Sequence, residues 1–428
     1  MLNINLTIFA LQTSDMKNFF IGLLFATSTA LNAQVDSTIV KVKKETKDDD
    51  YKINMSPYYS YGDGLGITSA DSIYQVNIRF RMQNRVTYFN NEDEDEEDAI
   101  DAQIRRLRLR FDGYVGNPKF EYSIQLSFAS GDVGAAEEGK NTNIIRDAMI
   151  YYKPNKHWSF GFGQTKLPGN RQRINSSGAL QLTDRSINNA DFNIDRDFGF
   201  QVQHSKKQND KFSYTLRGAI SSGEGRNWTD HNDTGLAYTG KVELLPLGAF
   251  KNDGTNFEGD IMREEKPKVM VSAAYSYNNN AHRTQGQLGD EMFGTSNIQS
   301  LFLDAMFKYH GWAFMYAYMN RNADTIFTYN PEDTSDFRYV YAGHGHDFQA
   351  SYTFPKNYEL IGRFSNQKVK KEIFEFAPNS NQFSLGLTKY IWEHAFKLQA
   401  EVTYENLKFY DATTKDNWYA RLQIEIGI

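Results

Sequence analysis

Arginine recurs at positions of the same parity in two stretches of this chain, so its guanidinium groups share one face wherever the backbone is extended. The residues are Arg79, Arg81 and Arg85 in the first stretch and Arg106, Arg108 and Arg110 in the second. A guanidinium stays charged at every physiological pH, and its planar fork of N–H donors matches the oxygens of phosphate and carboxylate. Several such groups in a row, each binding weakly, let a small anion move from one to the next. The spacing therefore predicts anion binding.

Apolar residues fill the alternate positions of the second stretch, which indicates a strand with one apolar and one polar face. The apolar row consists of Leu107, Leu109 and Phe111. After a tight turn at 116–118, residues 120–128 alternate again, which predicts a hairpin of two membrane-length strands. An apolar row facing lipid and a polar row facing water is typical of a transmembrane β-barrel. A strand of a soluble β-sandwich also alternates, and there the arginine face is only a solvated surface.

The composition of the whole chain favours the barrel. It combines 26 Tyr and 31 Phe with a mean hydropathy of -0.61, and its body has no apolar run of helix-spanning length. A barrel fits this combination because only every second strand residue meets lipid. The absence of Cys excludes disulfides and thiolate metal sites. The net charge of -6 does not identify a ligand, because the placement of charges matters more than their sum.

The N-terminal residues have the pattern of an export signal. The apolar run from Phe19 to Ala26 follows Lys17 and leads into small residues that end at Ala33. This predicts a secretory signal over residues 1–33, with Met16 as the expected true start. A membrane anchor helix is the alternative, but the run is short and lacks a stop-transfer flank. Export, strands and no anchor helix together predict the outer membrane of a Gram-negative bacterium.

Three regions follow from this pattern. Residues 34–55 are polar and charged, which predicts a flexible periplasmic lead-in after the signal. Residues 56–428 are expected to form an outer-membrane β-barrel. Within them, residues 56–71 are rich in Gly and Tyr and predict a short strand inside the barrel mouth or against its wall.

The alternating pattern recurs along the rest of the chain and gives sixteen expected strands, an even number as in bacterial barrels. Eighteen strands also fit, because boundaries read from sequence carry errors of several residues. The expected strands are 74–89, 104–115, 120–128, 144–153, 158–165, 197–204, 212–221, 236–244, 268–278, 299–310, 312–322, 345–354, 358–367, 382–392, 396–404 and 417–428. Short connections predict the periplasmic end and long ones the external end. One connection, 245–267, is long although it falls on the periplasmic side.

Further basic residues fall on the polar faces of later strands. They are Arg217, Lys241, Lys308 and Arg363, and we expect them to continue the anion pathway; Lys397 and Arg421 share such faces. Acids on the same faces, among them Glu121, Asp147, Asp304 and Glu425, provide the alternative that these bases simply form ion pairs.

The connection 167–193 is long, polar and basic. By our count it is the third external connection, which in porins commonly folds inward and narrows the pore. We therefore expect a constriction loop, although an ordinary surface loop fits the same sequence. The basic residues assigned to it are Lys166, Arg171, Arg173 and Arg185.

Two other features have bland explanations that compete with a functional one. The acidic run from Glu92 to Asp98 is either a solvated, self-repelling loop or a contact for divalent cations at the lipid surface. The pair His344 and His346 is the one His spacing that could bind a metal, and it is more often incidental. No motif marks a hydrolase nucleophile or a nucleotide-binding loop, so we expect neither an enzyme nor a cofactor.

With the strands placed, the chain resembles the phosphate-selective porin O and P family from about Gly64 onward. The segments that carry the resemblance are RRLRLRFDGYVGNPKFEYSIQLSF, RDAMIYYKP from Arg146, GQTKLPGN from Gly163, DRS from Asp184, RDFGFQV from Arg196, and the LPLGAFK to GDIMREEKPK insert. The resemblance implies a sixteen-stranded barrel, usually a homotrimer, whose lumen carries an arginine ladder and passes anions. The chain departs from the pattern at Ile428, where outer-membrane barrels usually end in an aromatic residue.

The sequence thus predicts an outer-membrane porin that passes small anions, with phosphate or polyphosphate-like solutes first among them. Its expected partners are these anions, outer-membrane lipid and further copies of the chain, and nucleic acid is not expected. The alternative is a structural or assembly barrel that belongs to a secretion or surface complex.

Overall fold

The computed structural model describes residues 58–60, 64–91, 98–133, 143–227 and 233–428. The predicted signal over 1–33 and the lead-in over 34–55 lie outside the described residues. The acidic run lies outside them too, except for Asp98, which accepts hydrogen bonds from the side chains of Tyr88 and Asn90.

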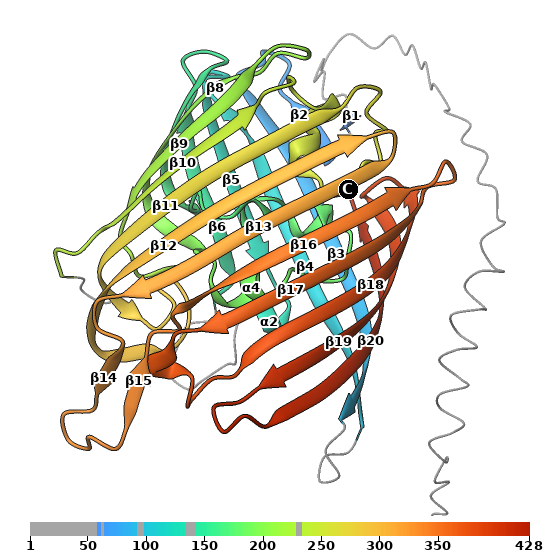
Figure 1. Ribbon diagram of the computed structural model, residues 1–428. Coiled ribbons are helices and arrows are strands. Elements are labelled where there is room, and N and C mark those ends of the chain that lie inside the picture. The colour runs from blue at the N-terminus through green and yellow to red at the C-terminus, as the bar shows by residue number, and fades with distance from the viewer. Residues whose placement is uncertain (1–57, 61–63, 92–97, 134–142, 228–232) are drawn as a thin grey trace, which may run out of the picture. The chain divides into compact units, whose positions relative to one another are not determined.

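The described chain forms a closed barrel of sixteen antiparallel strands (Figure 1). The barrel strands are β3 (Tyr74–Asn91), β4 (Ala99–Val115), β5 (Phe120–Ser127), β6 (Ile145–Tyr152), β7 (Trp158–Lys166), β8 (Arg196–Lys206), β9 (Ser213–Ser221), β10 (Ala237–Leu245), β11 (Lys268–Arg283), β12 (Glu291–Tyr309), β13 (Trp312–Ala323), β16 (Gly343–Thr353), β17 (Tyr358–Val369), β18 (Asn379–Trp392), β19 (Phe396–Lys408) and β20 (Thr414–Gly427). Each strand pairs with the next, and β20 pairs with β3 to close the ring. The predicted fold class and strand count are confirmed.

Alternation of side chains explains why these segments form a barrel. On β20, Ile424 is 54% exposed on the outer wall, whereas its neighbours Gln423 and Glu425 are buried inside. A lipid environment offers no hydrogen-bond partners, so each backbone group must be satisfied by a neighbouring strand, and only a closed sheet achieves this. Among the described residues, no helix is long and apolar enough to cross a membrane.

A short addition lies beside the closing pair of strands. β2 (Gly64–Thr68) pairs with β1 (Tyr58–Ser60) and with the first part of β3, where Leu65 faces Ile78. β20 pairs with β3 from Arg81 onward, so β2 continues the edge that β20 leaves. The short strand expected within 56–71 therefore lies against the wall, and the sheet has 18 strands although the barrel itself has sixteen.

The wall is uneven in height, and β12 differs most from its expected strand. Strands β5 to β10 have 8 to 11 residues, close to the 9–11 residues that span a bilayer. β11 and β12 have 16 and 19 residues, which extends both beyond the expected 268–278 and 299–310. The extra residues lie at the external end, beyond register shifts at Asn278 and Ala281. The next external connection also carries a hairpin of β14 (Phe327–Tyr329) and β15 (Phe337–Tyr339).

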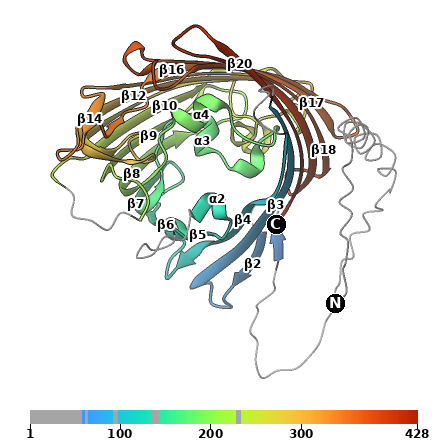
Figure 2. The ribbon, with the colours of Figure 1, turned by 90° about the horizontal axis from the view of Figure 1, so that it is seen from below.

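Several short helices lie inside the ring of strands, as the view along the barrel shows (Figure 2). They are α2 (Ser130–Val133), α3 (Arg171–Ile174) and α4 (Ile187–Asp191), and the chain also has the 3-10 turns η2 (Ser177–Ala179), η3 (Lys251–Asn256) and η4 (Lys371–Ile373). We call residues 167–195 the inward loop and residues 246–267 the periplasmic insert. Both fill part of the lumen, and their contacts define the site.

Candidate functional site

The arginines of β3 and β4 face each other across the inner wall of the barrel. The facing positions are Arg79 with Arg110, Arg81 with Arg108, and Gln83 with Arg106. Like charges directly opposite each other destabilise a sheet unless other groups intervene. Asp112 is the intervening group at the periplasmic end, because its carboxylate accepts from Arg110 Nε at 3.0 Å and also from Arg79. Two guanidinium groups thus share one carboxylate.

Asp184, on the inward loop, is the partner of a second arginine group. Its carboxylate oxygens lie 3.1 Å from Arg85, 3.0 Å from Arg105 and 2.9 Å from Arg106. Burial alone would raise the pKa of Asp184, but the three arginines outweigh it and hold that pKa well below its usual range. Three guanidinium groups share one carboxylate here, so the group keeps a positive excess.

A β-bulge brings Arg105 to the inner face of β4. The register of β3 and β4 shifts between Gln83 and Asn84, so that Gln83 faces Arg106 while Asn84 faces Ile104. Arg105 is the extra residue, and its Nε donates to Asp184 at 3.0 Å. Strict alternation gives Arg105 the parity of Leu107 and Leu109 on the outer face, which is why the sequence pattern missed it.

Asp132 on α2 does for Arg108 what Asp184 does for Arg106. It lies 2.5 Å from Arg108 and 2.9 Å from Arg146, and Ser127 Oγ donates to it at 2.7 Å. Although burial would raise the pKa of Asp132, Arg108 and Arg146 hold it below its usual range. A carboxylate from an external connection therefore again neutralises part of the arginine charge on β3 and β4.

The inward loop is held by side chains that donate to its backbone carbonyls. Lys397 reaches the carbonyls of Gly178 and Leu180 at 2.9 and 2.6 Å, and Arg363 reaches that of Asp184 at 3.0 Å. Lys241 reaches the carbonyl of Gly169 at 2.9 Å. The expected inward fold of this connection is what the structure has, and bases on distant strands fix it there.

The periplasmic insert enters the lumen from the opposite end and meets the inward loop. Lys308 Nζ donates to the carbonyls of Gly254, Phe257 and Gly259 at 2.7, 3.0 and 2.7 Å. Glu258 of the insert accepts from the backbone N–H of Gln181 in the inward loop at 3.0 Å. The two segments together fill the lumen along β10 to β19. For the periplasmic insert, the sequence had indicated only a long connection.

Two of the basic residues at the inward loop fix its own backbone, and a third contacts the periplasmic insert. Lys166 donates to the carbonyls of Ile174 and Asn175, Arg171 to that of Thr255, and Arg185 to those of Gln172 and Asn175. Arg173 instead forms an ion pair with Asp195 at 2.9 Å. The loop thus keeps a defined shape inside the barrel.

Open space remains beside the arginine strands. A cavity of about 320 Å³ reaches from β3 and β4 to β9, and one of about 440 Å³ adjoins it toward the end of β20. Both are lined by Arg81, Arg108 and Arg110, so they form one region. Arg217 and Lys166 line the first, and Arg79 lines the second.

A third cavity of about 460 Å³ opens on the external side of Asp184. Its basic lining residues are Arg105, Arg106, Arg173, Arg185 and Arg421. The predicted residues therefore separate into two sets. Those that line a cavity are Arg79, Arg81, Arg106, Arg108, Arg110, Arg217, Lys166, Arg173 and Arg185, whereas Arg85, Arg171, Lys241, Lys308 and Arg363 line none of the three and contact the inner segments instead.

Sequence reasoning missed several residues of the site besides Arg105. Arg196 lines the first cavity and forms an ion pair with Asp147 at 3.0 Å, and Arg146 pairs with Asp132. Arg146 and Arg196 each begin a segment that carries the family resemblance, which was the available signal. The acids Asp132 and Asp195 carry no such signal, because only the folded connections bring them to the arginines.

Comparisons with known proteins agree with this architecture. A family model described as phosphate-selective porin O and P matches residues 76–360. The outer membrane channel DcaP of Acinetobacter baumannii superposes with a TM-score of 0.51 at 11% identity, covering 85% of this chain and 99% of that one. The anion-selective porin from Comamonas acidovorans gives 0.51 at 10% identity, with 83% and 100% covered. These two structures are similar in fold. No curated protein matches the sequence.

Proposed function

Because the chain belongs to the phosphate-selective porin O and P family, and is thus an outer-membrane porin of a Gram-negative bacterium, we propose that it passes small anions, phosphate above all. Porins of this fold are channels and not enzymes. The proposed path follows the side of the lumen that β3, β4 and β9 line, beside the inward loop.

One observation carries the proposal, namely the charge of the open cavity beside the inward loop. Its basic lining residues are Arg81, Arg108, Arg110, Lys166, Arg196 and Arg217. Among the described residues that line it, Asp147 is the only acid, and it pairs with Arg196. The acids outside the lining that pair with Arg108 and Arg110 are each shared with a second arginine, so the lining keeps a positive excess. An excess of fixed positive charge inside a low-dielectric wall raises the local concentration of anions and lowers that of cations.

The ladder also suits a solute that must leave as well as enter. Phosphate oxygens match the guanidinium fork, but carboxylates such as Asp112 and Asp132 already occupy part of each fork. An anion therefore meets several weak sites in succession, and none holds it firmly. The side chain of Arg110 is 38% exposed, compared with 24% for Arg79, so Arg110 is the rung best placed to contact a passing anion.

The test is a planar-bilayer recording of the purified protein in a salt gradient. Anions should carry most of the current, and adding phosphate to a chloride solution should reduce the chloride current, because phosphate binds the ladder more tightly. Arg110→Gln should lower the anion-to-cation permeability ratio by about threefold, the effect of removing one nearby, partly screened charge.

Lys156→Gln is the matched control for that variant. It removes one positive charge from the exposed 153–157 turn, outside the lumen, and should leave the permeability ratio unchanged. A wild-type protein whose current is carried mainly by cations, or an Arg110→Gln variant that behaves like Lys156→Gln, would contradict the proposal.

We also propose that the protein is a homotrimer and that the short wall from β5 to β9 provides the contact between copies. This wall exposes large apolar residues, with Phe200 at 65% and Ile150 at 63%. Its strands have 8 to 11 residues and form the low side of the barrel, so neighbouring copies can approach closely there. Native mass spectrometry in detergent should give three times the chain mass, and a monomer mass would contradict this proposal.

A further inference from the structure

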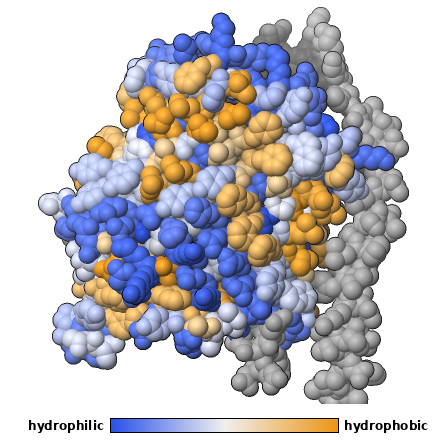
Figure 3. All heavy atoms as spheres, viewed as in Figure 1, coloured by the Kyte–Doolittle hydropathy of each residue, from blue (hydrophilic) through white to orange (hydrophobic). Residues whose placement is uncertain are grey.

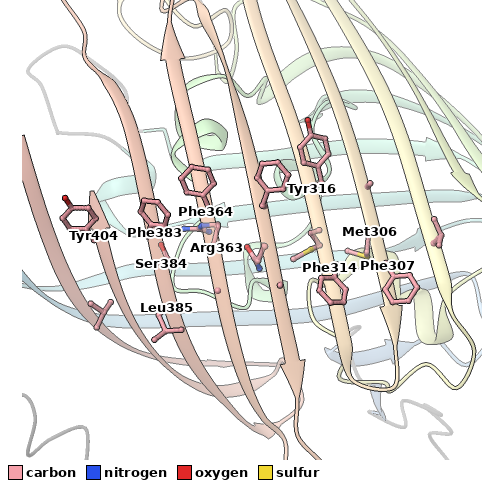
Figure 4. A pocket seen from close by; sticks show the side chains of 18 residues that line it. Met306, Phe307, Phe314, Tyr316, Arg363, Phe364, Phe383, Ser384, Leu385 and Tyr404 are labelled. Atoms are coloured by element: carbon pink, nitrogen blue, oxygen red, sulfur yellow. The ribbon is translucent and has the colours of Figure 1, made fainter. Parts of the chain in front are cut away.

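The external cavity beside Asp184 is lined by aromatic rings as well as by arginines. Phe89 on β3 and Tyr419 on β20 face each other across the closing strand pair, with ring centroids 6.1 Å apart. They have the parity of Arg85 and Gln423, so they face the lumen. Figure 3 shows hydrophobic side chains on the outer wall, where rings such as Phe383 face lipid (Figure 4). Lipid contact does not explain the lumenal pair.

Arg421 extends this aromatic surface inward. Its Cζ lies 3.9 Å from the centroid of the Tyr419 ring, so the guanidinium stacks on the ring. Glu401 faces Arg421 on β19, but its carboxylate accepts from the backbone N–H and the hydroxyl of Thr183 at 2.9 and 2.6 Å. Within the described residues, no ion pair or hydrogen bond involves Arg421, and its Nε is buried without a partner. This guanidinium is therefore available to a solute.

The outer end of the same cavity offers hydrogen-bond acceptors. Glu405 on β19 faces Asn417 on β20, and both line the cavity. Ser380 and Gln382 donate to Oε1 of Glu405 at 2.9 and 2.8 Å, which leaves Oε2 without a donor in the described part of the chain. Oδ1 of Asn417 is buried and has no partner there either. Two open acceptors on facing residues suit a solute that carries N–H donors.

The inner end of the cavity is basic. Its lining arginines there are Arg105, Arg106, Arg173 and Arg185. The side chains of Arg105 and Arg173 are 24% and 18% exposed, compared with 3% for Arg106. The acids that pair with them are shared, because Asp184 contacts three arginines and Asp195 contacts Arg196 as well as Arg173. A positive excess therefore remains, which suits a phosphate group.

Register along β3 and β20 orders these groups from the outside inward. Asn417 comes first on β20, and the facing pairs that follow are Tyr419 with Phe89, Arg421 with Thr87, and Arg106 with Gln83. Acceptors, rings and guanidinium groups thus succeed one another. Asn417 and Arg421 stand about 14 Å apart along β20, at about 3.4 Å per residue. A bare phosphate ion is too small to contact both levels at once.

We infer that the external cavity binds a phosphate monoester that carries a planar ring with N–H donors, of the kind found in purine nucleoside monophosphates. The ring stacks beside Phe89 and Tyr419 with its donors toward Glu405, and the phosphate binds Arg421 and Arg105. Nucleobases stack in this way on aromatic rings and on guanidinium planes. The volume of about 460 Å³ falls within the range of about 300–1,000 Å³ that is typical of sites for small organic ligands. The inference rests on the proposed anion path, because it places this site at the external entrance of that path.

The test is a calorimetric titration of the purified full-length protein with guanosine monophosphate and with ribose phosphate, which keeps the phosphate but lacks the ring. Guanosine monophosphate should bind about tenfold more tightly, the effect of stacking one base. Phe89→Leu should raise the Kd for guanosine monophosphate by about fivefold and leave that for ribose phosphate unchanged. Phe383→Leu is the matched control, because it replaces a ring on the outer wall, and it should change neither Kd.

Arg421→Gln tests the phosphate end of the site. It should raise the Kd for both ligands by about tenfold, the loss expected for one hydrogen bond to a charged group. Its control, Lys408→Gln, changes an exposed side chain at the end of β19 and should leave both Kd values unchanged. Glu405→Gln tests the ring end and should raise the Kd for guanosine monophosphate but not that for ribose phosphate. Because Glu405 lies near the end of β19, this variant keeps the inference testable even if Phe89→Leu fails to fold.

Three results would overturn the inference. The wild type could bind ribose phosphate as tightly as guanosine monophosphate, Phe89→Leu or Glu405→Gln could bind guanosine monophosphate as tightly as the wild type, or Arg421→Gln could behave like Lys408→Gln. Failure of the proposed conduction path is read from ion preference in the bilayer, whereas failure here is read from the two Kd values. The two failures are therefore distinguishable.

Discussion

Asp184→Asn isolates the charge that balances the external arginine group. The substitution keeps the shape of the side chain and removes one negative charge from Arg85, Arg105 and Arg106, which lie 2.9 to 3.1 Å from its oxygens. The amide oxygen still accepts from one of them, but the other guanidinium groups lose their ion pair. We expect two effects, a stronger preference for anions and a weaker hold on the inward loop.

The effect on selectivity follows from Coulomb's law. One unit charge about 8 Å from a passing anion, at an effective dielectric constant of about 40, is worth about 1 kcal/mol, or about sixfold in local concentration. Screening at about 0.1 M salt, where the Debye length is about 10 Å, reduces this to about two- to threefold. The anion-to-cation permeability ratio should rise by at least that factor, because cations are depleted as anions accumulate.

The effect on stability has the opposite sign. Removing one partner of a buried ion pair costs about 3–5 kcal/mol of stability. Because the Asp184 side chain is 22% exposed, we expect a smaller loss of about 1–3 kcal/mol. The cost is local, because the barrel strands do not depend on this residue. It should appear as faster proteolysis of the inward loop and as noisier open-channel current.

The assay compares zero-current potentials in a salt gradient for the wild type, Asp184→Asn and Asp411→Asn. Asp411 is fully exposed in an external connection, where its carboxylate accepts from Thr413, so it controls for loss of a carboxylate outside the lumen. A shift of Asp184→Asn toward cations, or no shift relative to Asp411→Asn, would refute the placement of this charge beside the ion path.

Three other outcomes are expected. Lys308→Met removes three hydrogen bonds to the periplasmic insert, so single-channel conductance and trypsin cleavage within 246–267 should both rise, whereas Lys266→Met, at an exposed side chain, should change neither. The pKa of Asp184 and of Asp195 is depressed, so the ion pairs of the inward loop are lost only when pH falls through those low values; hydrogen-exchange protection of residues 167–195 should be the same at pH 7 and at about pH 4.5, and lost protection there would count against these ion pairs. Leu109→Ser should reduce the yield of heat-modifiable barrel because its side chain faces lipid, while Arg110→Ser should leave that yield intact and lower anion preference; the reverse result would place the arginines outside the lumen.

Period-two alternation was enough to predict most of the barrel. It located all sixteen strands, because in a lipid-facing strand each inward polar residue is followed by an outward apolar one, as at Gln423 and Ile424. It failed at the external ends of β11 and β12, where the strands leave the hydrocarbon and the outer face no longer needs apolar residues. Alternation reports the lipid boundary and not the hydrogen-bonded strand.

The interior was less predictable, because its contacts join residues far apart in the chain. Lys308 has the parity of a lumenal base, and only the folded periplasmic insert shows that its donors contact the carbonyls of Gly254, Phe257 and Gly259. Arg105 has the wrong parity, and only the bulge places it beside Asp184. Parity therefore identifies which bases face inward, but not which of them remain open to a solute.

The ratio of acids to arginines reconciles two requirements of the lumen. A row of unpaired guanidinium groups on adjacent strands would repel and would oppose barrel closure. Complete pairing would remove the field that attracts anions. Here Asp112 serves two arginines and Asp184 three, so repulsion is relieved while a positive excess remains at both ends of the ladder. Because Asp184 comes from the inward loop, the same ion pairs that balance the charge also fix the loop that narrows the lumen. Any change that neutralises the arginines should consequently weaken the position of the loop as well as the preference for anions.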